Sequence, residues 1–99
     1  MEVNIKAIKF DATEMLQSFI QKKVGKLEKL SDDIRKVEVS LKVVKPETAL
    51  NKQVDILVSL PKEELFATKV CDTFEEATLQ SLEAVERQIA RYKEKQSPK

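Results

Sequence analysis

The sequence predicts an α+β domain with the element order β-α-β-β-β-α, in which two parallel helices pack on one face of a four-stranded mixed sheet. Four short segments alternate apolar and polar residues, which is the period of a strand with one buried face. Two longer segments carry apolar residues three and four positions apart, as amphipathic helices do. The 99 residues suffice for a single domain. We assign residues 1–96 to it and expect residues 97–99 to form a frayed tail.

The first strand is predicted over residues 3–8 and the first helix over residues 14–30. Thr13 is the expected N-cap of this helix, and a capping box of Asp11 with Glu14 is the alternative. Gly25 lies inside the helix at a cost of about 1 kcal/mol relative to alanine. We expect close packing of Gly25 against a neighbour to offset that cost. The apolar stripe of the helix comprises Leu16, Phe19, Ile20, Val24, Leu27 and Leu30.

Three further strands are predicted over residues 34–44, 53–60 and 64–71. The longest loop, residues 45–52, joins the first two of them, and Pro61 begins a tight turn between the last two. The last strand has two possible buried faces, one with Leu65 and Ala67 and the other with Phe66, Thr68 and Val70.

The second helix is predicted to begin after Thr73, which has Glu76 at capping-box spacing, and to run to about Lys95. Because the first helix connects two strands as a crossover, those strands are expected to form a parallel pair. Hairpins join the remaining strands and reverse the direction each time. The first, second and fourth strands therefore run the same way, and the two helices run parallel to each other.

The composition excludes most kinds of catalytic site. The chain has no histidine, one cysteine and one glycine, so it cannot hold a Ser-His-Asp triad, an imidazole-ligated zinc or a glycine-rich phosphate loop. The adjacent acids at residues 32–33 and 63–64 are expected to be solvated, and Cys71 to be a packed thiol. We therefore predict that the protein is not an enzyme and has no cofactor, metal or small-molecule substrate.

The net charge of +1 argues against nucleic-acid binding over the whole surface. No apolar run is long enough to cross a bilayer, and no signal-peptide pattern precedes the domain. These features favour a cytoplasmic protein without a membrane partner.

The two signs of charge are, however, separated along both helices. Residues 72–86 contain acids and no base, whereas residues 87–99 are mostly basic, and the first helix is divided in the same way. At about 100° per residue, Lys22, Lys26 and Lys29 form one row, and Arg87, Arg91 and Lys95 form another. Parallel helices would place both basic halves at one end of the domain, where they would suit a phosphate backbone.

A simpler interpretation is that the charges follow the helix dipole, which favours acids at the start of a helix and bases at its end. Lys23 has two interpretations as well. It lies within the apolar stripe, so it either reaches a phosphate from the groove between the helices or is a lysine at the edge of the stripe.

Both helices carry residues that match a known family. The first has Thr13-Glu14, Leu16, Phe19, Val24 and Lys26-Leu27-Glu28, and the second ends with Arg87-Gln88-Ile89, Lys93 and Lys95. With the element order, these residues make the chain resemble the short bacterial ribosome hibernation-promoting factors, also called ribosome-associated inhibitors or sigma-54 modulation-type proteins. The family's basic positions correspond to Lys23, Lys26, Arg87, Arg91, Lys93 and Lys95. Lys22 and Lys29 are added as candidate RNA-binding residues from the helical row alone.

The resemblance implies a non-catalytic RNA-binding protein with a fold similar to double-stranded-RNA-binding domains. Such a protein would bind the small ribosomal subunit and its rRNA at the mRNA/tRNA region of the A and P sites. It would repress translation in idle cells, in stress or stationary phase, and could promote ribosome dimers. Because no added C-terminal domain follows the second helix, we expect a short-form role with a separate ribosome-dimerising factor.

The second helix departs from the family pattern at its start and in its middle. Where the family usually has Asp-Met-Tyr and Ala-Ile-Asp, this chain has Thr73-Phe74-Glu75 and Ala77-Thr78-Leu79, and Glu83 and Glu86 add acidic charge.

The alternative function is a small regulatory protein-interaction module that uses the open face of the sheet. It would hold if Leu57 and Phe66 form an apolar patch on that face.

Overall fold

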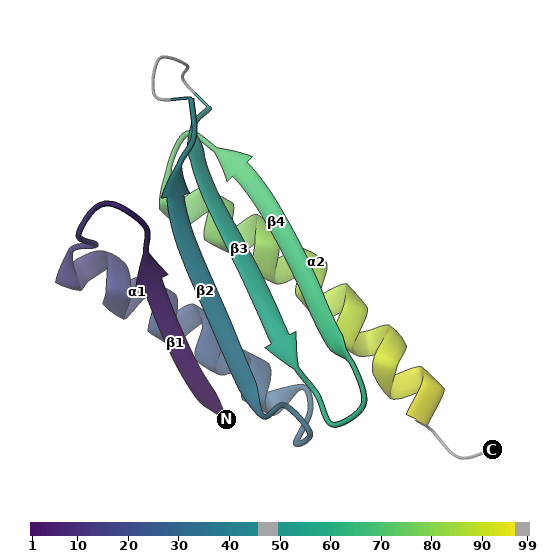
Figure 1. The fold of residues 1–99 in the computed structure, drawn as a ribbon. Helices are drawn as coiled ribbons and strands as arrows, with labels where there is room; N and C mark the ends of the chain where they lie inside the picture. The colour runs from purple at the N-terminus through teal and green to yellow at the C-terminus, as the bar shows by residue number, and fades with distance from the viewer. Residues whose placement is uncertain (46–49, 97–99) are drawn as a thin grey trace.

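The sheet has four strands, and two helices cover one of its faces in the computed structural model, which describes residues 1–45 and 50–96 (Figure 1). The tail at 97–99 and residues 46–49 of the expected loop lie outside the described residues. The element order is the predicted one. The elements are β1 (Glu2–Ala7), α1 (Glu14–Gly25), the 3-10 helix η1 (Lys26–Lys29), β2 (Lys36–Val43), β3 (Lys52–Ser59), β4 (Glu64–Cys71) and α2 (Phe74–Gln96).

The strands lie in the order β1-β2-β3-β4. β1 pairs in parallel with β2, with Val3 opposite Val37, and the other two pairs are antiparallel. β1, β2 and β4 therefore run in one direction, and α1 and α2 run side by side in the same sense as each other (Figure 1). The mixed sheet and the parallel helices were both predicted from the connections, and both predictions are confirmed.

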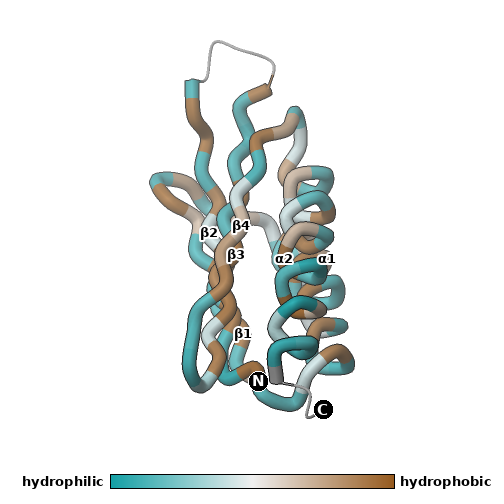
Figure 2. The backbone as a smooth tube through the Cα atoms, turned by 90° about the vertical axis from the view of Figure 1, so that its right-hand side faces the viewer, coloured by the Kyte–Doolittle hydropathy of each residue, from teal (hydrophilic) through white to brown (hydrophobic). Residues whose placement is uncertain are grey.

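The hydrophobic core lies between the sheet and the helices (Figure 2). α1 contributes Ile20 and Val24, which are fully buried, and α2 contributes Val85 and Ile89 in the same way. On β4 the buried side chains are those of Leu65 and Ala67, whereas Phe66, Thr68 and Val70 are exposed. The structure thus decides between the two faces that the sequence left open for this strand.

Both helices begin with the predicted threonine caps. The backbone N–H of Leu16 donates to Thr13 Oγ1 at 3.1 Å, and the backbone N–H of Glu76 donates to Thr73 Oγ1 at 3.1 Å. Each bond satisfies one donor of a first helical turn that has no partner within the helix. The cap at Thr13 is therefore confirmed over the alternative that used Asp11.

The predicted first helix is too long as an α-helix. α1 ends at Gly25, and the backbone N–H of Lys26 bonds the carbonyl of Lys23, three residues back, which is the 3-10 pattern. The expected close packing of Gly25 is also wrong, because a Cβ atom built there would meet nothing within 4 Å. The glycine has an ordinary φ of −58° and marks the change of helix type.

Replacing Gly25 with alanine is therefore expected to raise the free energy of unfolding by about 0.4–1 kcal/mol. The native backbone already suits alanine, and the substitution reduces the conformational freedom of the unfolded chain. Urea unfolding of both proteins measures the change, and an unchanged slope against urea concentration serves as the control. A loss of stability would contradict the open surroundings of Gly25.

Gln88 of α2 closes the free edge of β4. Its side-chain Nε2 donates to the carbonyl of Phe66 at 2.8 Å, and its Oε1 accepts from the N–H of Phe66 at 3.3 Å. These two backbone groups point away from β3, so the amide takes the place of a neighbouring strand. Gln88 therefore marks the side of α2 that faces away from α1.

Candidate nucleic-acid interface

The side of α1 that faces α2 follows from the residues that lie on its other side, next to β1. The amino group of Met1 lies 3.6 Å from a carboxylate oxygen of Glu28, and Gln17 lines a hollow beside β1. Gln17 and Glu28 therefore mark the β1 side of this segment. Phe19 and Lys23 lie about half a turn away from Gln17 in helical phase, so they face the groove between α1 and α2.

The basic residues of α2 do not all lie on one side. Arg91 and Lys95 follow Gln88 by three and seven positions and so share its side, over the edge of β4. Arg87 faces outward between that side and the groove. Lys93 alone among the four predicted bases of α2 turns toward α1. The predicted row of Arg87, Arg91 and Lys95 thus exists, but it faces away from the groove because α2 is anchored to β4 through Gln88.

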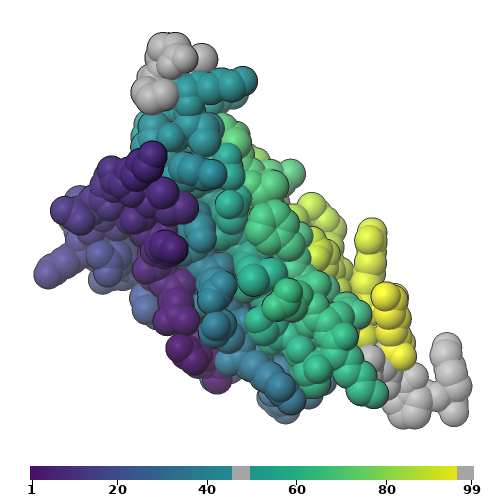
Figure 3. Space-filling view, viewed as in Figure 1, coloured from purple at the N-terminus to yellow at the C-terminus, as the bar shows by residue number. Residues whose placement is uncertain are grey.

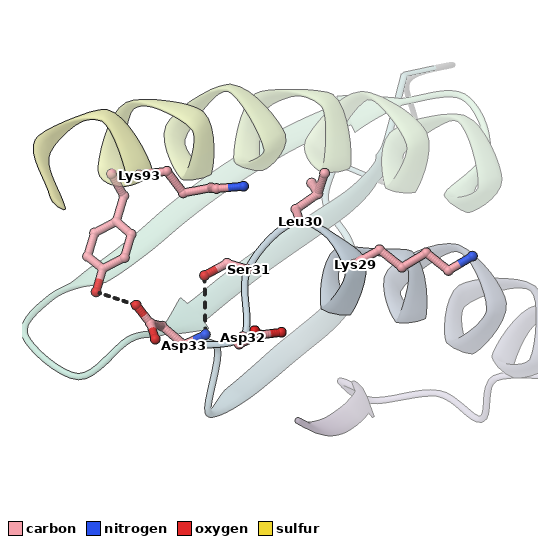
Figure 4. Close-up of a pocket in the computed structure, with 7 residues that line it drawn as sticks. Lys29, Leu30, Ser31, Asp32, Asp33 and Lys93 are labelled. Carbon is pink, nitrogen blue, oxygen red and sulfur yellow. Dashed lines mark hydrogen bonds between the residues drawn. The ribbon is translucent and has the colours of Figure 1, made fainter. Parts of the chain in front are cut away.

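The basic ends of the two helices meet in one open pocket of about 380 Å³. Lys29 comes from η1 and Lys93 from α2, and Figure 4 shows both side chains at this pocket. This agrees with the prediction that the parallel helices place their basic halves at one end of the domain. The other residues that line the pocket are Leu30, Ser31, Asp32, Asp33 and Tyr92.

Two exposed carboxylates, those of Asp32 and Asp33, limit the positive charge of this pocket. The N–H of Asp33 donates to Ser31 Oγ at 3.2 Å, and the Tyr92 hydroxyl donates to Asp33 Oδ2 at 3.5 Å. Burial and the neighbouring Asp33 carboxylate raise the pKa of Tyr92, so its hydroxyl stays protonated. The side chain of Lys29 points away from both carboxylates (Figure 4). A phosphate could therefore meet Lys29 on the side turned away from the two carboxylates.

Of the lysines in α1 and η1, only Lys29 lines this pocket. Lys22, Lys26 and Lys29 are exposed. Because a 3-10 helix has about three residues per turn, Lys26 and Lys29 lie one above the other. Lys23 is half-buried, and its Nζ lies 5.6 Å from the centre of the Phe19 ring. This cation–π contact supports the interpretation of Lys23 as a lysine at the edge of the stripe, and a phosphate contact remains a prediction.

Figure 3 shows the molecule from the open face of the sheet, and the burial pattern of β3 and β4 places the residues of the alternative function on this face. Leu57 and Phe66 are cross-strand partners, and Phe66 is 51 % exposed. The backbone groups of Phe66 point outward to Gln88, so this pair is not hydrogen-bonded and its side chains lie close together. Polar groups surround the pair, among them the Lys36–Glu38 ion pair at 3.0 Å and the Asp55 carboxylate that accepts from Gln53 and Thr68. The apolar area is thus a small island in a polar face.

Other chemistry has little support in the described part of the chain. It contains no group of three or more histidine, cysteine, aspartate or glutamate side chains placed to hold a metal ion. Burial raises the pKa of the Cys71 thiol, which keeps it protonated and unreactive. None of the described helices is long and apolar enough to span a membrane.

Two solved structures share this fold. A ribosomal subunit interface protein from Coxiella burnetii superposes with a TM-score of 0.78 at 22 % identity, covering 94 % of this chain and 98 % of its own. The N-terminal domain of Protein Y from Thermus thermophilus gives a TM-score of 0.79 at 17 % identity, covering 93 % and 99 %. No curated protein sequence matches the chain significantly.

The family is shown by a sequence model that covers nearly the whole domain. The model described as sigma 54 modulation protein / S30EA ribosomal protein matches residues 3–97. Those residues include the whole sheet except Glu2, and both helices with the basic ends that meet in the pocket. The chain belongs to the sigma 54 modulation protein / S30EA ribosomal protein family, whose members are ribosome-associated proteins and not enzymes.

Proposed function

We propose that this protein binds the small ribosomal subunit at the mRNA/tRNA region of the A and P sites and represses translation in idle cells. The observation that carries the proposal is the meeting of Lys29 and Lys93, which brings two separate basic segments to one end of the domain. Membership of a ribosome-associated family supplies the partner. The structural neighbour from Coxiella burnetii, described as a ribosomal subunit interface protein, supports the same partner.

The proposed rRNA contacts come from both sides of α2 and from the end of α1. On the groove side they are Lys22, Lys23, Lys26, Lys29 and Lys93, and on the outer side they are Arg87, Arg91 and Lys95. Ammonium and guanidinium groups on two helices can follow a folded RNA backbone without stacking on its bases. That mode suits a chain with no tryptophan and one tyrosine, which is itself buried.

The proposed function also implies where the protein acts, when it accumulates and which further factor it works with. The protein would act in the cytoplasm, where ribosomes translate. It would accumulate under stress or in stationary phase. Ribosome dimers would form with the help of a separate dimerising factor.

Co-sedimentation with purified small ribosomal subunits at rising salt tests this function. If the protein neutralises even three phosphates, its affinity should fall roughly 20- to 40-fold between about 50 and 200 mM monovalent salt. Addition of the protein to a cell-free translation reaction should lower its output. Failure of the protein to pellet with subunits at low salt would contradict the proposal.

The open sheet face provides a second candidate function, a protein-interaction module centred on Leu57 and Phe66. An apolar contact of this kind should be insensitive to salt or strengthened by it. Subunit binding that is equally strong at low and high salt, and is lost on replacing Phe66 with serine, would favour this candidate over the phosphate interface.

A further inference from the structure

An apolar patch lies on the helix surface toward the starts of α1 and α2, and most of the basic residues lie toward the helix ends. It consists of Met15, Phe19 and Leu79. Met15 is 85 % exposed and Leu79 is 43 % exposed, which are high values for large apolar side chains. Met15 is not among the predicted functional residues, and Leu79 is one of the departures from the family pattern.

Helical phase places the three side chains on the sides of α1 and α2 that face each other. Leu79 precedes Gln88 by about two and a half turns, so it lies on the opposite side of α2, toward α1. Met15 precedes Gln17 by two positions, about half a turn in phase, and Phe19 is one turn beyond Met15. Met15 and Phe19 line one shallow hollow with Glu14, Ser18 and Lys22.

The two helices are also aligned at this level. The rings of Phe10 and Phe74 stack at 5.3 Å near the starts of the helices, and Lys29 and Lys93 share a pocket near their ends. In both pairs the two residues are the same number of positions apart in the sequence. Met15 and Leu79 are also that number of positions apart. The apolar side chains of α1 and α2 therefore lie at about the same height along parallel helices and face each other across the groove.

Carboxylates flank this patch on α2 and at the start of α1, whereas Lys22 and Lys23 border it next to Phe19. Glu14 precedes it on α1, and Glu75 and Glu83 lie beside Leu79 on α2, all three exposed. None of the three takes part in an ion pair within residues 1–45 and 50–96. An RNA backbone would be repelled on the α2 side of the patch, because its phosphates would approach the unpaired carboxylates beside Leu79.

We propose that the Met15–Phe19–Leu79 patch docks a basic protein segment that carries apolar anchor residues. Apolar side chains of such a segment would bury the patch, and its lysine or arginine side chains would pair with Glu14, Glu75 and Glu83. The inference rests on the proposed function, since the segment would belong to a ribosomal protein next to the bound rRNA. The helix surface then has two halves: the basic half binds rRNA and the acidic-apolar half binds protein, which fixes the direction in which the domain lies.

Site-specific photo-crosslinking on purified ribosomes tests this inference. The photoreactive residue p-benzoylphenylalanine is placed in one variant instead of Met15 and in a second variant instead of Ala90, which is exposed between the basic residues. We expect position 15 to crosslink to a basic segment of a ribosomal protein, identified by mass spectrometry, and position 90 to crosslink to rRNA. Crosslinking of position 15 to rRNA, or to nothing while position 90 still reaches rRNA, would overturn the inference alone. Absence of both crosslinks would overturn the proposed function with it.

A double variant gives an independent measurement. Met15→Ser with Leu79→Ser removes the exposed anchors without touching the core, so the thermal melt should stay close to that of the parent protein. Affinity for ribosomes is expected to fall roughly tenfold, because two partly buried apolar contacts are lost, and the slope of affinity against salt should stay the same. Unchanged affinity would refute the docking role, and a reduced slope would indicate that the patch lies on RNA instead.

Discussion

Reversing the charge of Lys26 and Arg91 together is expected to abolish binding to the small ribosomal subunit. Lys26 lies on the groove side of η1, and Arg91 lies on the outer side of α2, above the β4 edge. Replacing both with glutamate removes two phosphate contacts and adds two repulsive charges. If each reversal costs at least 1.4 kcal/mol, or tenfold, the pair should weaken binding by roughly a hundredfold or more. Co-sedimentation of Lys26→Glu/Arg91→Glu with ribosomal subunits measures the loss.

The control variant carries the same change in net charge at other places. Lys6→Glu/Lys69→Glu alters one exposed lysine on β1 and one on β4, both outside the helices. This variant should pellet with subunits nearly as well as the unchanged protein, because its substitutions lie away from the basic helix ends. Both double variants should melt near the parent temperature, since all four side chains are exposed. Equal pelleting of the two variants would mean that net charge, and not the helix surface, controls binding.

Replacing Ile56 with alanine is expected to lower the free energy of unfolding by about 2–5 kcal/mol. Ile56 is fully buried on β3, opposite Val39 of β2 and Ala67 of β4, at the centre of the sheet. The loss combines the transfer of the missing methyl groups with the cavity left among neighbours that cannot collapse into it. Because small domains unfold with only about 5–15 kcal/mol, this variant should lose a large share of its stability.

Ile56→Val is the graded control for this prediction. It removes one methylene-sized group at the same position, and it should cost about 0.5–1.5 kcal/mol. Urea unfolding of the three proteins gives the order of stability directly. Nearly equal midpoints for the alanine variant and the parent would show that the sheet centre repacks, contrary to its dense burial.

The fold could be predicted because local patterns and connection rules agreed. Alternation of apolar residues located the strands, and the threonines at 13 and 73 located the helix starts, where the structure has side-chain caps. The crossover connection through α1 required β1 and β2 to be parallel. The hairpin connections required the other two strand pairs to be antiparallel. These signals depend on neighbours in sequence, so no knowledge of distant contacts was needed.

The errors and ambiguities fell where distant contacts decide. Gly25 was expected to be packed against another element, yet it is the point where α1 gives way to η1. The sequence left two possible buried faces for the last strand. The helices cover the face that carries Leu65 and Ala67. Periodicity describes which residues share a face, but it does not say which face another element will cover.

The candidate interface shows most clearly which features follow from the order of residues along the chain and which depend on distant contacts. The sequence alone established that charge is separated along each helix and that the helices are parallel, because both follow from order along the chain. Only the tertiary structure decided how each helix is rotated about its axis. The amide of Gln88 bonds the β4 edge and turns Arg91 and Lys95 outward, while Lys93 meets Lys29 in the groove and Leu79 faces the side of Met15. Rotation depends on contacts between residues far apart in sequence, and a pattern along one helix contains no record of them.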